Sequence, residues 1–204
     1  MSAAIPKDLV TNDAGLVPVI VQDRASGDVL MVAWSNAEAM AKTAETGFAT
    51  FWSRSRKALW RKGETSGHGM RVVEARTDCD RDVLLLVVEP QGPACHTNAR
   101  TCFGEDSPTA AGMLEELARV VAERAGASPE ESYTARLLAT GRDQVLAKIS
   151  EEAAELVAAA RGESDERLAA EAADLLYHLV VALHQRRLPL TRVMDELRQR
   201  RGAR

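Results

Sequence analysis

The chain has 204 residues, a formal net charge of −4 at pH 7 and 46% hydrophobic residues. This length suits one large domain or two domains of about 100 residues each. A chain with net negative charge has no overall positive potential with which to bind nucleic acid, so we expect no nucleic-acid partner. We expect a small phosphorylated ligand instead.

We also expect no membrane or secretory segment. The longest apolar runs, residues 83–88 and 175–183, fall short of the roughly 20 residues that cross a bilayer. The first ten residues lack an apolar segment behind a basic start. The three cysteines, an odd number, agree with free thiols in a reducing compartment. We therefore predict a cytoplasmic protein.

The first hundred residues predict short strands separated by turns. Residues 16–23 and 29–34 are rich in β-branched side chains and flank a glycine-containing loop, which predicts a β-hairpin. Residues 36–45 predict a helix that begins at Asn36 and stops at Gly47. This half is therefore predicted to be α+β and strand-dominated. The remaining strand candidates are residues 48–52, 59–63, 70–77 and 82–90.

Basic side chains gather in the stretch FWSRSRKALWRKGETSG, residues 51–67, interleaved with hydroxyl residues and glycines. Such a stretch offers bidentate donors, hydroxyl groups and close backbone approach, which suit a phosphate group. A solvated basic strand is the alternative. The aromatic residues of this stretch could also stack on single-stranded nucleic acid, but the net negative charge of the chain argues against such a partner. The candidate phosphate or substrate contacts of this half are Arg54, Arg56, Lys62, Ser66 and His68.

Three aspartates alternate at Asp78, Asp80 and Asp82, directly before an apolar strand. On an extended strand they share one face, while Cys79 points to the other. Three carboxylates repel one another unless a cation lies between them, and oxygen ligands suit Mg²⁺ or Ca²⁺. Because Asp78 and Asp82 would stand about 13 Å apart on an extended strand, we predict that the segment bends. A solvated acidic turn is the alternative.

An EF-hand calcium loop is a further interpretation of these aspartates, since together with Glu89 they match four of its ligand positions. Its sharp turn needs glycine where this chain has Val83, and an apolar strand follows instead of a polar loop. We therefore reject the EF-hand interpretation.

The cysteines Cys79, Cys95 and Cys102 follow the spacing C-x15-C-x6-C. Thiolates are preferred zinc ligands, although this is not a standard zinc-finger spacing, and buried thiols acting as small hydrophobes are the alternative. Residues 91–93 and 97–99 are loop sequences, where an inert buried thiol is less expected. Three protein ligands leave a fourth position for water, as in catalytic zinc sites.

Zinc lowers the pKa of a bound water toward about 7, so such a site would supply a nucleophile at neutral pH. His96 lies beside Cys95 and is our candidate to carry protons, because imidazole exchanges protons near neutral pH. His68, in the segment SGHGM, is a second candidate with less support.

Four segments of this half together resemble phosphoribosyl-AMP cyclohydrolase of histidine biosynthesis: VLMVAWSNAEAM, SRSRKALWRKGETSG, DCDRD and GPACHTNARTCF. The resemblance implies that the three cysteines bind Zn²⁺, with Cys79 donated across a homodimer interface, and that the three aspartates bind Mg²⁺. It further implies hydrolytic opening of the six-membered purine ring of N1-(5-phosphoribosyl)-AMP, between N1 and C6, by zinc-activated water. Asn98 departs from the glycine expected after CHT.

Composition changes near Gly104, because every Cys, Trp and Phe precedes it. The segment GEDSPTA, residues 104–110, is of the kind that ends one element and caps the next. We therefore predict two domains, residues 1–106 and 107–204. The second has helical periodicity almost throughout and is predicted to be an all-α bundle. Its first helix is expected to begin at Ser107-Pro108 and to end near Gly126. Three further helices are expected at residues 141–161, 165–185 and 190–201.

Two of these helices carry acidic residues where the apolar stripe should face the core. Glu152 lies within the stripe and Glu155 follows one turn later. Glu171 and Asp174 repeat the three-residue spacing on the next helix. Four inward carboxylates are costly to ionise without a counter-charge, so they predict bound metal or held protons. A solvated acidic face is the alternative.

This pattern, with SYTARLLATGRDQVLAKISEEAAEL, resembles the all-α nucleotide pyrophosphohydrolases and most of all phosphoribosyl-ATP pyrophosphohydrolase. The resemblance implies that the four acidic residues hold Mg²⁺, with Glu151 as a further member. Mg²⁺ neutralises phosphate oxygens, and a metal-bound or carboxylate-activated water attacks in line and releases pyrophosphate. Glu152 and Glu155 are therefore candidate catalytic residues. Lys148 and Arg136 are our candidates for triphosphate contacts.

Together these features predict a bifunctional, cytoplasmic, metal-dependent enzyme of histidine biosynthesis that forms a homodimer. Two alternatives stand beside this prediction. One is a nucleotide-pool hydrolase with a zinc-stabilised appendage, which would hydrolyse ordinary nucleoside triphosphates. The other is a zinc-dependent regulatory or nucleic-acid-binding module, whose binding would weaken steeply with salt.

Overall fold

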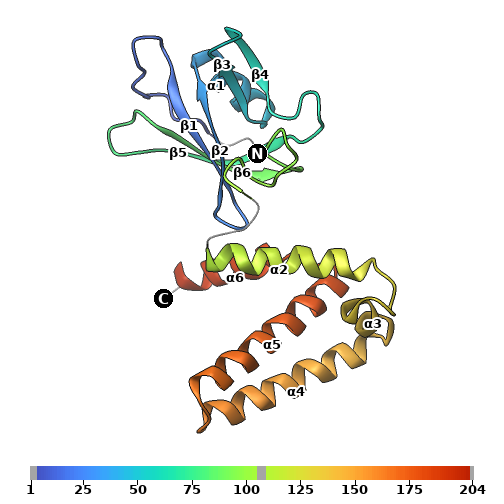
Figure 1. Cartoon of the computed structure of the whole chain (residues 1–204). Coiled ribbons are helices and arrows are strands. Elements are labelled where there is room, and N and C mark those ends of the chain that lie inside the picture. The colour runs from blue at the N-terminus through green and yellow to red at the C-terminus, as the bar shows by residue number, and fades with distance from the viewer. Residues whose placement is uncertain (1–3, 105–108, 203–204) are drawn as a thin grey trace. The chain divides into compact units, whose positions relative to one another are not determined.

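The structure is a computed structural model that describes residues 4–104 and 109–202. The chain divides into two compact units, Met1–Gly112 and Met113–Arg204. The first is rich in strands and the second is helical, which confirms the predicted fold class (Figure 1). The predicted boundary between residues 106 and 107, and the predicted helix start at Ser107-Pro108, lie outside the described residues.

A four-stranded sheet forms the frame of the first unit (Figure 1). Its strands follow the order β2-β1-β6-β5, in which β1 and β6 run parallel and the other neighbours antiparallel. The bounds of these strands are β1 (Val17–Asp23), β2 (Val29–Ser35), β5 (Met70–Thr77) and β6 (Leu84–Pro90). A two-stranded sheet is made of β3 (Thr50–Ser53) and β4 (Ala58–Arg61).

Alternation of side chains along β1 fixes which face of the sheet is covered. Val17, Val19 and Val21 are fully buried while the residues between them are half-buried, as expected for a strand with one face on the core. They pack in one cluster with Leu84 and Phe51. The parallel register sets Val19 of β1 opposite Leu84 of β6. These two strands, far apart in the chain, lie side by side in the middle of the sheet and share this core.

Helix α1 (Ala37–Thr46) begins and ends at the residues that the sequence predicts. The side chain of Asn36 accepts a hydrogen bond from the backbone N–H of Ala39 at 2.8 Å, which satisfies one free donor of the first turn. Gly47 ends the helix with a φ of 75°, in the left-handed region that glycine adopts at no steric cost.

The second unit consists of helices around a small aliphatic core. That core is formed by Val121, Leu137, Val145, Val180 and Val181. The short helix α3 was not predicted; its side-chain cap is Ser132, which accepts from the N–H of Ala135 at 3.1 Å. The helices are α2 (Ala110–Ala125), α3 (Tyr133–Ala139), α4 (Arg142–Ala160), α5 (Asp165–Gln185) and α6 (Leu190–Gly202).

Helices α4 and α5 form a hairpin and carry all four predicted acidic residues (Figure 1). Ser164 caps α5 and accepts a hydrogen bond from the N–H of Arg167 at 3.3 Å. Within the described residues, no helix combines the length and the apolar character needed to cross a membrane.

Candidate metal and substrate sites

A cavity of about 500 Å³ in the first unit gathers many of the predicted site residues. Its walls come from the segment around β4, the loop before β5 and the loop after β6. Met31 and Trp60 add apolar surface to a lining that is otherwise mostly polar. The predicted residues that line it are Arg56, Lys62, Ser66, His68, Cys95, His96 and Cys102.

Cys95 and Cys102 both line this cavity, and each thiol affects the pKa of the other. The hydroxyl of Thr97 donates to the Cys95 sulfur at 3.1 Å, and this contact is the main reason that the pKa of Cys95 lies below the ordinary thiol value. Desolvation and the neighbouring Cys95 raise the pKa of Cys102. The His96 Nδ1 atom lies 3.7 Å from the Cys95 sulfur. The imidazole of His96 therefore lies beside the Cys95 thiol, in the cavity that Cys102 also lines.

The loop between these cysteines explains the departure at Asn98. Asn98, where the resemblance leads us to expect glycine, has a φ of 67°, in the left-handed region. Asparagine visits that region more readily than most other residues. Its N–H donates to the carbonyl of Cys95 at 3.2 Å and closes the turn. The substitution therefore keeps the backbone shape.

Two glycines, one within the loop that carries Ser66 and His68 and one in the loop after β6, allow close contacts that a side chain would block. Gly63 has a φ of 82°, and a Cβ there would lie 2.3 Å from the backbone nitrogen of Gly69. A Cβ on Gly92 would lie 2.6 Å from the ring of His68. The imidazole of His68 therefore rests against bare backbone at the edge of the cavity.

The three aspartates lie in the loop that joins β5 to β6, and the predicted bend is confirmed. Ligand oxygens of Asp78, Asp80 and Asp82 all lie within 4.8 Å of one another. The Asp78 carboxylate accepts a hydrogen bond from the N–H of Val83 at 3.1 Å, which closes the loop. The charge of Asp80 raises the pKa of Asp82. Mutual repulsion of this kind is relieved by a divalent cation, so the donor set fits Mg²⁺.

Cys79 lies in the same loop and its side chain is exposed. Within one chain it does not join Cys95 and Cys102 in a group of three ligand atoms, judged over the described residues. The structure thus places Cys95 and Cys102 in one cavity, whereas Cys79 is not among the residues that line it.

In the second unit, α4 and α5 bring three carboxylates together. Ligand oxygens of Glu152, Glu155 and Glu171 lie within 4.8 Å of one another. Glu152 and Glu171 are buried, at 6% and 2% exposed, whereas Glu155 is exposed. The fourth predicted member, Asp174, is exposed and outside this group, but its charge helps to raise the pKa of Glu171.

Glu171 is the member with the most unusual surroundings. Burial is the main cause that raises its pKa, followed by the contact with Glu155. Its Oε2 atom is buried and has no hydrogen-bond partner among the described residues. A buried carboxylate oxygen without a partner is costly, and a hard cation is a ligand that would satisfy it. The residues present therefore fit Mg²⁺.

Two cations balance part of this negative charge. The ammonium group of Lys148 lies 2.9 Å from Glu151 and 3.0 Å from Glu152, and these hydrogen bonds raise its pKa. The guanidinium of Arg167 lies 2.5 Å from Glu171 and 3.7 Å from Glu155. The sequence prediction omitted Arg167, although its position four residues before Glu171 was a usable signal.

His178 is a second residue that the sequence analysis missed. It is 4% exposed, and its Nδ1 atom lies 2.9 Å from the carbonyl of Asp174 and 3.6 Å from Glu152. Because a carbonyl only accepts, Nδ1 carries a proton, and Nε2 faces the hydroxyl of Tyr133 at 3.3 Å. A histidine inside the apolar run LLYHLVVAL was the available signal.

Two predicted phosphate contacts make other interactions. The guanidinium of Arg54 lies over the ring of Trp34, 4.6 Å from its centre, and Arg54 is not among the residues that line the cavity. Arg136 donates to the carbonyl of Pro129 at 3.1 Å and lies over the ring of Tyr133.

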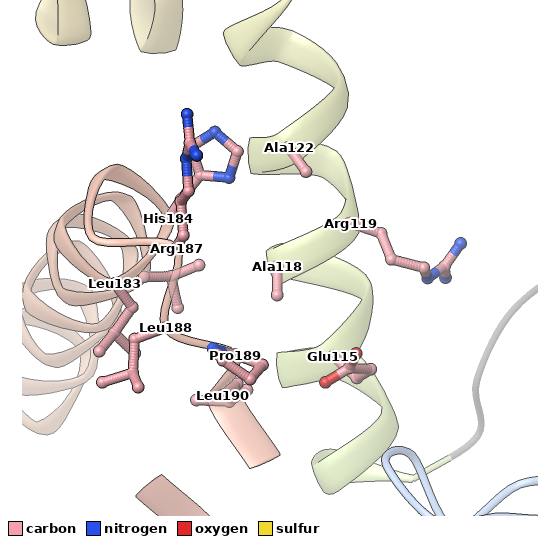
Figure 2. Close-up of a pocket in the computed structure, with 11 residues that line it drawn as sticks. Glu115, Ala118, Arg119, Ala122, Leu183, His184, Arg187, Leu188, Pro189 and Leu190 are labelled. Carbon is pink, nitrogen blue, oxygen red and sulfur yellow. The ribbon is translucent and has the colours of Figure 1, made fainter. Parts of the chain in front are cut away.

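A second cavity, of about 600 Å³, lies between α2 and the segment that joins α5 to α6 (Figure 2). Its lining is mostly aliphatic and includes Ala118, Ala122, Leu183 and Leu188 (Figure 2). The three carboxylates brought together by α4 and α5 do not line it. It is therefore a feature separate from the candidate metal site.

Comparison with known proteins assigns each half. Residues 31–104 match the family described as phosphoribosyl-AMP cyclohydrolase, and residues 114–201 match the family described as phosphoribosyl-ATP pyrophosphohydrolase. The histidine biosynthesis bifunctional protein of Bacillus subtilis is 49% identical over 95% of both chains. Its namesake in Synechocystis is 48% identical over 98% of this chain and 96% of its own.

A third relative with the same description, from Thermus thermophilus, is 48% identical over 84% of this chain and 82% of its own. The matches cover both units in one continuous chain, in the same order. The chain therefore belongs to the family of histidine biosynthesis bifunctional proteins, which join a phosphoribosyl-AMP cyclohydrolase domain to a phosphoribosyl-ATP pyrophosphohydrolase domain.

Proposed function

We propose that the chain catalyses two consecutive hydrolyses on phosphoribosyl nucleotides. The domain of residues 107–204 cleaves phosphoribosyl-ATP into phosphoribosyl-AMP and pyrophosphate. The domain of residues 1–106 then opens the six-membered purine ring of phosphoribosyl-AMP between N1 and C6. The observation that carries this proposal is the presence of two separate donor sets of different chemistry, one of thiols and one of buried carboxylates.

In the first domain, Cys95 and Cys102 supply two thiolate ligands for Zn²⁺, and Cys79 of a second chain supplies the third. When bound, zinc would lower the pKa of a coordinated water and so supply a nucleophile at neutral pH. His96 stands beside Cys95 and transfers protons at its imidazole. The phosphate group is held by Arg56, Lys62 and Ser66, with His68 at the edge of the same cavity.

In the second domain, Glu152, Glu155 and Glu171 hold Mg²⁺, with Asp174 and Glu151 completing the ligand set. When bound, Mg²⁺ neutralises charge on the triphosphate oxygens. Glu155 is the exposed member of the group, so it is placed to accept a proton from the attacking water. Lys148, already hydrogen-bonded to Glu152, lies at the metal group and contacts the released phosphates.

We infer a homodimer, and the position of Cys79 supports this inference. Within one chain, judged over the described residues, its sulfur is not grouped with the other two thiols. An isologous interface would exchange Cys79 reciprocally and create two equivalent zinc sites. Cysteines that bind zinc must stay reduced, which suits the reducing cytoplasm. The Asp78, Asp80 and Asp82 group adds a Mg²⁺ site next to Cys79 in the same loop.

Metal analysis and product analysis test the proposal together. Purified chain is expected to contain zinc and, with added Mg²⁺, to convert phosphoribosyl-ATP to pyrophosphate and the ring-opened product. Cys95→Ser should abolish ring opening and spare pyrophosphate release. Glu171→Gln should reduce pyrophosphate release at least about 100-fold, because loss of an outer-shell partner alone typically costs about 10- to 100-fold, while ring opening of supplied phosphoribosyl-AMP continues.

Reciprocal loss is the informative outcome. Equal loss of both activities in either variant would indicate collapse of the fold. Equal hydrolysis of ordinary nucleoside triphosphates and phosphoribosyl-ATP, without ring opening, would replace this proposal with a nucleotide-pool hydrolase.

A further inference from the structure

Arg100 lies between the two cysteines of the cavity loop, and its guanidinium is turned into the protein. Its side chain is 15% exposed, and its partners Asp23 and Asp28 are 8% and 3% exposed. Nη1 lies 3.3 Å from the Asp23 carboxylate and 3.4 Å from the hydroxyl of Ser26, while Nη2 contacts Asp28. One arginine therefore bridges two buried carboxylates in the turn between β1 and β2.

The turn that receives Arg100 also has hydrogen bonds of its own. Asp23 accepts hydrogen bonds from the N–H of Ala25 at 3.0 Å and from the hydroxyl of Ser26 at 3.2 Å. Ser26 in turn accepts from the N–H of Asp28 at 3.1 Å. The Asp23 N–H also donates to the Asp28 carbonyl at 2.9 Å. The two carboxylates are thus fixed by the ends of two core strands.

The cysteine loop is also attached to the rest of the unit by backbone hydrogen bonds and by Ala94, which is buried in the core. The carbonyl of Arg100 accepts from the N–H of Ala94 at 3.1 Å, which closes the loop on itself. The N–H of Cys102 donates to the carbonyl of Leu30 in β2 at 2.8 Å. The guanidinium of Arg100 is therefore a side-chain link from the middle of this loop to the sheet.

We propose that Arg100 is a positioning residue that, through Asp23 and Asp28, holds Cys95 and Cys102 in the arrangement that binds zinc. This inference rests on the proposed zinc site of the first domain. A loop held in its bound shape loses less conformational entropy when the ion binds, so its affinity is higher than that of a free loop. Arg100 is not among the residues that line the cavity, so it is not placed to contact a substrate bound there.

Arginine suits this role better than lysine. Its planar guanidinium presents donors in a fixed fork and can address two carboxylates at once. A lysine would keep the charge but supply a single mobile ammonium group. The proposal therefore predicts that the shape of the cation matters, and not its charge alone.

The test compares zinc affinity in four full-length variants with that of the wild-type chain. Arg100→Lys and Asp28→Asn each leave part of the cluster intact, so they are expected to fold. Arg71→Lys and Glu89→Gln are matched controls, because they make the same chemical changes in an exposed ion pair of the same unit. Zinc dissociation constants are measured by competition with a chromophoric chelator. Tryptophan fluorescence reports folding of the first unit, which contains all three tryptophans.

Arg100→Lys and Asp28→Asn are expected to weaken zinc binding by about 10- to 100-fold, the usual range for outer-shell partners, while the controls stay within about twofold of wild type. In cobalt-substituted protein, the same two variants should shift the thiolate-to-metal absorption band, which a loss of stability alone would not do. Pyrophosphate release by the second unit should be unchanged.

Wild-type zinc affinity and an unshifted cobalt band in folded Arg100→Lys and Asp28→Asn would overturn the positioning role. Full rescue by lysine would overturn the requirement for a fork. If wild-type chain binds no more zinc than Cys95→Ser, the zinc site itself fails, and that result is distinct from failure of the Arg100 inference.

Discussion

At the scale of single residues, the two thiols of the cavity differ in acidity. The hydroxyl of Thr97 lowers the pKa of Cys95, whereas desolvation raises that of Cys102. At neutral pH more of Cys95 is therefore ionised, and the thiolate is the form that attacks an alkylating reagent. In chain stripped of metal, iodoacetamide should modify Cys95 several times faster than Cys102.

Peptide mapping by mass spectrometry gives the two rates. The difference between the two alkylation rates should narrow as the pH rises above 9.0, the ordinary pKa of a thiol, because Cys102 then ionises as well. Thr97→Val should slow the reaction of Cys95, while Thr46→Val, which removes an exposed hydroxyl in α1, should leave it unchanged. Equal rates for both cysteines at neutral pH would contradict this assignment of the acidic thiol.

Which site residues could be read from sequence depended on what each residue type can do alone. Cysteine and clustered glutamate are ligands by their chemistry, so Cys95, Cys102 and Glu171 were predicted. Arg100 and Arg167 were not, because an arginine is as common on a solvated face, and only the tertiary structure sets its partner. Asn98 was noted as a departure, and its positive φ explains it.

At the scale of elements, the loop between β4 and β5 depends on a backbone approach that only glycine allows. Gly63→Ala should destabilise the first unit by about 3 kcal/mol, since both the left-handed φ and a clash with backbone oppose the methyl group. Gly67 has a similar φ of 76° with open space around it, so Gly67→Ala should cost only about 1 kcal/mol.

Urea unfolding followed by tryptophan fluorescence compares the two alanine variants directly. As urea is added, Gly63→Ala should also lose ring-opening activity at a lower urea concentration than pyrophosphate release, because the same loop carries Ser66 and His68 into the cavity. Equal destabilisation by both substitutions would show that φ alone, rather than contact with Gly69, governs this position.

Local sequence patterns predicted most elements and the hairpin of β1 with β2, which the structure confirms, but not the pairing of strands far apart in the chain. The alternation in β1 and the cap at Asn36 are local properties, so the strand and helix were found. Helix α3, with seven residues, is too short to show a helical repeat. The bend at Asp78 to Asp82 followed from a distance argument. The parallel neighbour of β1 could not be predicted, because it is chosen by contacts far apart in the chain.

At the scale of the whole molecule, the proposed sharing of zinc ligands between chains leads to a complementation test. Cys79→Ser and Cys95→Ser should each be inactive in ring opening. Mixed after dissociation and reassociation, they should regain about a quarter of wild-type activity, because random pairing makes half of the dimers mixed and each mixed dimer has one intact site.

Ring-opening assays on the mixture, with dimer formation checked by analytical ultracentrifugation, give the result. A mixture of Cys95→Ser and Cys102→Ser is the control and should stay inactive, because both thiols come from the same chain. No recovery with Cys79→Ser, in dimers shown to have exchanged, would mean that the zinc site is complete within one chain.

The parallel pairing of β1 with β6 also affects the chain while it is being made. β1 and β2 can form their hairpin as soon as residue 35 is available, but the other side of β1 has no hydrogen-bonding partner until residues 84–90 follow. During that interval an apolar strand edge is open to pairing with other chains. Ribosomal pausing between residues 36 and 84 would therefore favour aggregation, whereas pausing within the helical half would not.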